Sequence, residues 1–201
     1  MITDVDIAKV EPEVFSSVVF GAQLRCGGTN GIVSGTQFTA SGVDFDVSQV
    51  TAGNMIWLES VDGSIKGTFE VVSVTDSTHL SVSQIRADAS DAAIPIGSGS
   101  GLTWRIKTLE PQIAQTEIQL SGRLGLKPGV ANAAYGIDEV EPVDVLKQIA
   151  TALLLIGVYT VLYTTSTDET VRDGYEQKRN WYNQQAERLL AGISVQLPAA
   201  S

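Results

Sequence analysis

Residues that support catalysis are scarce in this chain of 201 residues, which contains one histidine and one cysteine. His79 lies in an alternating stretch, so we interpret it as a surface strand residue, and a single histidine rules out a His-based zinc site. Cys26 stands beside two glycines and has no cysteine to pair with, which favours a small buried hydrophobe over a nucleophile. The sequence therefore predicts no enzyme, no resident metal and no cofactor.

Two further motifs resemble binding sites only in part. Residues 97–101 alternate glycine and serine, but a strand is expected to follow and no Gly-Lys-Ser/Thr is attached, which favours a flexible linker over a phosphate loop. Asp138, Glu139, Glu141 and Asp144 offer oxygen ligands for a hard cation, yet their spacing matches no EF-hand loop. We interpret them as acidic residues that stabilise the positive end of the following helix.

Composition and charge exclude several classes of protein. The chain is 43% hydrophobic and carries a net charge of −10. No segment is basic, which disfavours tight nucleic-acid binding as the primary activity. Residues 1–6 lack the basic start of a signal peptide, so we expect none. The apolar run at 149–163 is shorter than the roughly 20 residues that span a bilayer, so we expect a buried helix and no membrane partner.

Alternation and recurrent turn signals predict an all-β unit at residues 27–107. Residues 102–106 alternate apolar and polar side chains, as a strand with one apolar face does. Asp-Gly at 62–63 predicts a hairpin between two further strands. Residues 86–101 include a proline and are expected to form a long mobile loop or a weak edge strand. This unit is interpreted as a small barrel or sandwich.

The rest of the chain is expected to be helical. Capping residues, proline and glycine positions mark the helix ends. Within residues 3–25 we expect a short helix followed by a second turn or two. Further helices are expected at residues 111–124, 143–163 and 167–191. The predicted fold class is α+β: a helical bundle of about four helices, formed by residues 1–26 and 108–193, with a small all-β barrel or sandwich (27–107) inserted. Residues 194–201 are expected to form an extended C-terminal tail.

The helix at 143–163 has apolar residues on all of its sides, which predicts that it is covered all round. Burial against neighbouring subunits is the expected solution, and a fully intrachain core is the alternative. The candidate oligomer-interface residues are Leu146, Ile149, Leu153, Leu154 and Tyr159.

Three helical patterns point to a family. The first has small and apolar positions at Ile113, Ala114, Ile118 and Leu124. The second carries Pro142, Leu146, Ile149, Ala150, Leu153 and Leu154. The third carries Tyr175, Tyr182, Ala186 and Leu190, and Gly192 closes it. With these patterns, residues 113–193 resemble the head-to-tail connector (adaptor) proteins of tailed bacteriophages, and residues 2–15 are similar to the family's opening helix. The chain departs from the family in its β unit, because plain members have a short connection there.

The resemblance implies a structural virion protein without catalytic activity. It implies a dodecameric ring that docks beneath the portal protein and offers its far side to a tail or nozzle protein. DNA would pass through the lumen without sequence-specific binding, and an acidic wall suits that passage because it does not retain a polyanion. The protein would be made in the host cytoplasm and would reside in the virion, at the head-tail junction.

The C-terminal tail is a second candidate site. Val195 and Leu197 alternate ahead of Pro198, a pattern suited to adding an extended strand to another protein. A frayed terminus without a role is the alternative. Because connector proteins often send this segment into the portal, the resemblance implies that Val195, Gln196, Leu197 and Pro198 dock there.

Two other functions compete with the connector interpretation. One is a tail terminator or head-completion ring, which would dock to the tail tube and not to the portal. The other is a binding module whose β unit recognises a carbohydrate or a host surface, with Trp57 and Trp104 as the stacking residues if they are exposed. Trp104 alternates with Leu102 and Ile106, which favours a core position for it.

Overall fold

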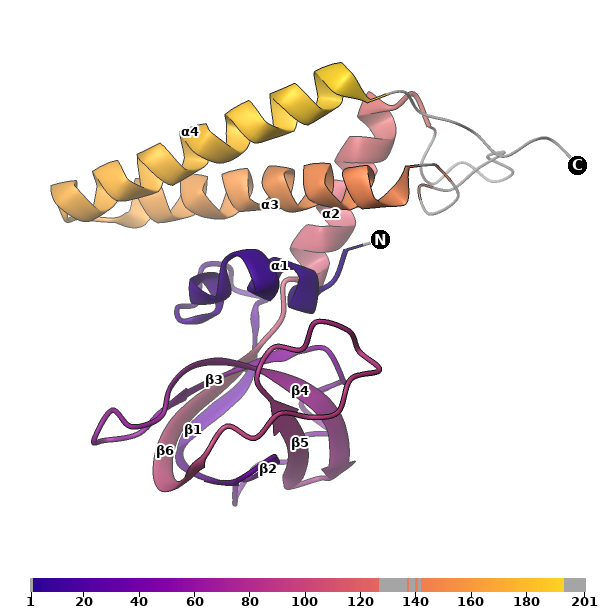
Figure 1. Cartoon of the computed structure of the whole chain (residues 1–201). Helices are drawn as coiled ribbons and strands as arrows, with labels where there is room; N and C mark the ends of the chain where they lie inside the picture. The colour runs from indigo at the N-terminus through magenta and orange to yellow at the C-terminus, as the bar shows by residue number, and fades with distance from the viewer. Residues whose placement is uncertain (1, 127–136, 138–139, 141, 194–201) are drawn as a thin grey trace, which may run out of the picture. The chain divides into compact units, whose positions relative to one another are not determined.

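The computed structural model describes residues 2–126, 137, 140 and 142–193, and they divide into two compact units. Residues 3–109 form one unit (the barrel unit), and Ile2 with the residues from Glu110 onward forms the other (the hairpin unit). Figure 1 shows the elements. The barrel unit contains α1 (Asp4–Val10), η1 (Pro12–Phe15), β1 (Leu24–Ser34), β2 (Gln37–Thr39), β3 (Met55–Glu59), β4 (Lys66–Asp76), β5 (His79–Ser83) and β6 (Ser98–Lys107). The hairpin unit contains α2 (Glu110–Arg123), α3 (Val143–Thr165) and α4 (Glu169–Gly192).

The six strands close into a barrel in the order β1-β2-β5-β4-β3-β6, and every neighbouring pair is antiparallel. Closure leaves no unpaired sheet edge. Register shifts interrupt β1 beside β6 and β4 beside β5, which indicates bulges that bend these long strands around the barrel. Residues 98–101, expected in a linker, instead form the start of β6.

Aromatic side chains fill the barrel interior. Phe38, Phe45 and Trp104 are almost fully buried, and the two phenylalanine rings meet the indole edge-on with centroids 5.5 and 5.9 Å away. Gly31 on β1 makes this packing possible, because a Cβ there would stand 2.8 Å from the Phe38 ring and 2.9 Å from the Trp104 ring. The core is thus closely packed around one point where the backbone must come near the rings.

Part of the outer face of the barrel, along β3, is also covered. On β3, Ile56 and Leu58 belong to the interior cluster, whereas the alternate residues Met55 and Trp57 point outward and are nevertheless buried. The N-terminal segment lies over this face. Thr68 donates to the carbonyl of Pro12 at 2.8 Å, the ammonium of Lys107 donates to the carbonyl of Phe15, and the amide of Leu109 donates to Asp4 at 2.7 Å.

The expected helical bundle of about four helices is wrong. The chain has a closed six-stranded antiparallel barrel together with helices, and α1, which the sequence assigned to the bundle, packs on the barrel. Among the remaining helices, α3 and α4 pack along one another as a hairpin, and α2 makes a smaller contact with α3. The physical reason is the apolar outer stripe of β3, which needs a cover that the amphipathic N-terminal segment provides.

The α3–α4 hairpin begins and ends where local signals place it. Asp168 caps α4 by accepting from the amide of Val171 at 3.1 Å. Three residues between the helices force them to run antiparallel, so the first turn of α3 lies beside the last turn of α4 (Figure 1). By length and composition, α3 is long and apolar enough to cross a membrane. Within its apolar stretch of 18 residues, 44% is buried inside the chain.

Candidate functional site

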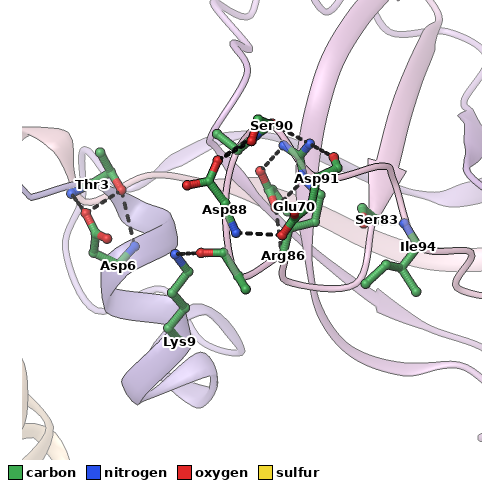
Figure 2. Close-up of polar contacts among 12 residues, drawn as sticks. Thr3, Asp6, Lys9, Glu70, Ser83, Arg86, Asp88, Ser90, Asp91 and Ile94 are labelled. Carbon is green, nitrogen blue, oxygen red and sulfur yellow. Dashed lines mark hydrogen bonds and ion pairs between the residues drawn. The ribbon is translucent and has the colours of Figure 1, made fainter.

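The loop that joins β5 to β6 is built around one buried ion pair, shown in Figure 2. Arg86 donates from Nη2 and Nε to the two carboxylate oxygens of Glu70, at 2.6 and 3.1 Å. Both side chains are more than nine-tenths buried. Hydrogen bonding to Glu70 raises the pKa of Arg86 above its usual value. Such a bidentate geometry fixes the guanidinium in one orientation.

The same guanidinium then shapes the loop. Its Nη1 donates to the carbonyls of Ala89 and Asp91, both at 2.8 Å. Asp88 accepts from the amide and hydroxyl of Ser90, and Lys9 of α1 donates to the carbonyl of Ala87 at 2.8 Å (Figure 2). The loop is therefore a defined surface with exposed carboxylates and alanines, whereas the sequence predicted a mobile loop or an edge strand. The sequence alone could not show that the loop is ordered. That order depends on the pairing of Arg86 with Glu70, which lies on β4, 16 residues earlier in the chain.

Aromatic and cationic side chains alternate along the α3–α4 hairpin. The rings of Tyr159 and Tyr182 stack 5.9 Å apart at an angle of 7°. The ammonium of Lys178 lies 5.2 Å from the Tyr159 ring centre and donates to its hydroxyl at 3.1 Å. Arg172 and Arg179 both lie over the Tyr163 ring, at 5.8 and 5.1 Å. These contacts fix one helix against the other through cation–π attraction and stacking.

The five proposed oligomer-interface residues lie on α3. Leu146, Ile149, Leu154 and Tyr159 are at most 4% exposed, and Leu153 is partly exposed. Four of the five are therefore covered within the single chain, and their role between subunits stays a prediction. In the described part of the hairpin, two large apolar side chains are exposed, Val171 at 45% and Trp181 at 53%, and the Trp181 indole lies against the ring of Tyr182.

The other candidate residues from the sequence do not come together in one site. Burial raises the pKa of Cys26 to about 11, so its thiol stays protonated and a poor nucleophile near neutral pH. His79 closes the β4–β5 turn through Asp76, at 2.8 Å. Trp57 and Trp104 are 8% and 1% exposed. Neither indole is therefore available for stacking on a sugar.

The remaining candidates fall partly outside the described residues. Asp144 is exposed in the first turn of α3, whereas Asp138, Glu139 and Glu141 lie outside the described ranges. The tail residues Val195, Gln196, Leu197 and Pro198 also lie outside them. Within the described part of the chain, no group of three or more histidine, cysteine or acidic residues is placed to hold a metal ion.

Comparisons with models of protein families, with curated proteins and with solved structures gave no significant match. The connector resemblance therefore depends on the residue patterns of the helices alone.

Proposed function

We propose that this chain is a structural virion protein that forms the head-to-tail connector (adaptor) ring between the portal and the tail of a tailed bacteriophage. The observation that carries the proposal is the residue pattern shared with that family on the two helices of the α3–α4 hairpin. The patterned residues Ile149, Ala150, Tyr182 and Ala186 are buried, as residues that hold such a hairpin together must be. The inferred ring is dodecameric and resides in the virion, at the head-tail junction.

The charge of the chain supports the inferred path of DNA. A net charge of −10 gives the ring an acidic character, and a polyanion passes an acidic wall without being retained. We infer that DNA crosses the lumen without sequence-specific contacts. The proposed partners are the portal protein on one side and a tail or nozzle protein on the other, and no membrane, cofactor or catalytic step is part of this function.

Electron microscopy of the protein mixed with the portal protein of the same virus tests the proposal. The expected result is a ring of this protein stacked on the portal. Co-sedimentation of a variant that lacks residues 194–201 tests the tail: the variant should keep its thermal stability and lose most portal binding. Full portal binding by the truncated chain would contradict the tail's role. Rings that bind only the tail tube would favour a tail terminator or head-completion protein instead.

A further inference from the structure

The turn between β3 and β4 holds an apolar side chain in solvent. Val61 is fully exposed at this turn. Asp62 stiffens the turn, since its Oδ1 accepts from the hydroxyl of Ser60 at 2.7 Å and from the amide and hydroxyl of Ser64 at 3.1 and 2.8 Å. Gly63 has a φ of 73°, which suits glycine at a tight turn. The chain thus presents a valine on a pre-ordered tip, although a polar side chain would be solvated there at a lower free energy.

The carboxylate at this tip keeps one oxygen available. The hydrogen bonds to the Asp62 carboxylate from the described residues all reach Oδ1, and the residue is exposed, so Oδ2 is available to a further donor. Those hydrogen bonds lower the pKa of Asp62 to about 2, so it is ionised at neutral pH. The tip therefore combines one apolar side chain with one negative charge that is ready to accept a further hydrogen bond.

A complementary hollow lies at the end of the α3–α4 hairpin, where α3 begins and α4 ends. It has a volume of about 260 Å³, and its lining residues are Pro142, Val145, Arg188, Leu189, Gly192 and Ile193. Among the described lining residues, Arg188 is the one that carries a charge. Arg188 has no hydrogen bond or ion pair with another described residue, although the chain carries an excess of acidic groups.

We propose that the Val61–Asp62 tip of one copy of this chain inserts into the α3–α4 hollow of a second copy. Val61 packs against the aliphatic lining, and Oδ2 of Asp62 accepts from the guanidinium of Arg188. Because tip and hollow are different surfaces, the contact is heterologous, and its repetition generates a closed ring or an open filament. The contact stands on these two surfaces alone, and only its closure into a ring rests on the proposed function.

Disulfide trapping tests the contact directly. In the variants Val61→Cys and Leu189→Cys the two new thiols would face each other across the interface, within the roughly 7 Å between Cα atoms that a disulfide tolerates. Mild copper-phenanthroline oxidation removes two hydrogens and joins them. A mixture of the two single variants should give linked dimers, and the double variant should give a ladder of higher oligomers. The wild type provides the background, because its lone Cys26 is partly buried with a raised pKa.

A matched control uses the other strongly exposed barrel valine. Val47 is 79% exposed in a different loop, so Val47→Cys mixed with Leu189→Cys should give little linked dimer. Equal cross-linking of both valine variants would overturn the proposal. A disulfide formed only within single chains of the double variant would also overturn it, because the tip would then occupy the hollow of its own chain. Arg188→Gln in the double variant should reduce the ladder, and Arg123→Gln should leave it unchanged.

The trapping is performed on the protein alone and on the protein mixed with portal, so that contact and function are tested separately. A ladder without any portal-bound ring would support the contact and contradict the connector function. Portal-bound rings without a cross-link would support the function and overturn this contact.

Discussion

Replacing Glu70 by glutamine should destabilise the barrel unit strongly, although the substitution changes the shape of the side chain very little. The substitution keeps the shape of the side chain and removes the negative charge that faces Arg86, whose guanidinium stays buried and ionised. Removing one partner of a buried ion pair costs about 3–5 kcal/mol. A domain of this size has a total stability of about 5–15 kcal/mol, so the loss is a large share of it. The melting temperature should fall by roughly 10–30 °C.

The barrel offers a matched control for that experiment. Glu59 and Lys66 form an ion pair with the same 2.6 Å separation on strands β3 and β4, but their side chains are 42% and 57% exposed. An exposed pair contributes about 0–1 kcal/mol, so Glu59→Gln should change the melting temperature little. The two variants therefore differ mainly in the burial of the charge that is left without its partner.

Tryptophan fluorescence during thermal unfolding measures both variants in a Trp181→Phe background, where the remaining tryptophans, Trp57 and Trp104, report on the barrel. Hydrogen exchange adds a local measurement. The amide of Arg86 donates to Glu70, and the amide of Ile94 donates to Ser83 in the same loop (Figure 2). Both should exchange faster in Glu70→Gln. Equal destabilisation by Glu59→Gln and Glu70→Gln would refute the reasoning from burial.

Three further outcomes are expected. Burial lowers the pKa of Lys107 to about 8 from 10.5, so between these values the unfolded chain binds more protons and barrel stability should rise with pH. Lys107→Met should flatten that slope in urea titrations, and an unchanged slope would assign it to another group. Residues 3–109 expressed alone should unfold cooperatively in a thermal melt followed by circular dichroism. Residues 27–107 should not, because without the N-terminal segment the outward side chains of Met55 and Trp57 are exposed to solvent. Denaturant unfolding should show that Tyr182→Ala lowers the free energy of unfolding by about 3–5 kcal/mol and Trp181→Ala by about 1 kcal/mol, because Tyr182 is buried and Trp181 is exposed. Equal losses in the two variants would contradict this reasoning.

Local patterns were sufficient for single elements. The alternation at 102–106 lies within β6, the Asp-Gly at 62–63 forms a hairpin turn, and Pro142 precedes a long helix at Val143–Thr165. Each of these depends on neighbours in the sequence: side-chain direction repeats every two residues in a strand, and proline and glycine constrain their own backbone. The two-sided burial of β4 at residues 68–71 could not be read from its valines, because Val71 and Val74 both pack at the interior cluster across a register shift.

Only the tertiary structure decided which surfaces these elements share. An amphipathic segment such as residues 4–15 fits a helical bundle and a barrel face equally well, and the choice was made by the outward residues Met55 and Trp57, which lie far away in the sequence. The partner of Arg86, the covering of Trp57 and the hollow beside Arg188 all join residues distant in the chain. Periodicity reports that a side chain will be buried, whereas the identity of its neighbours depends on how the whole chain closes.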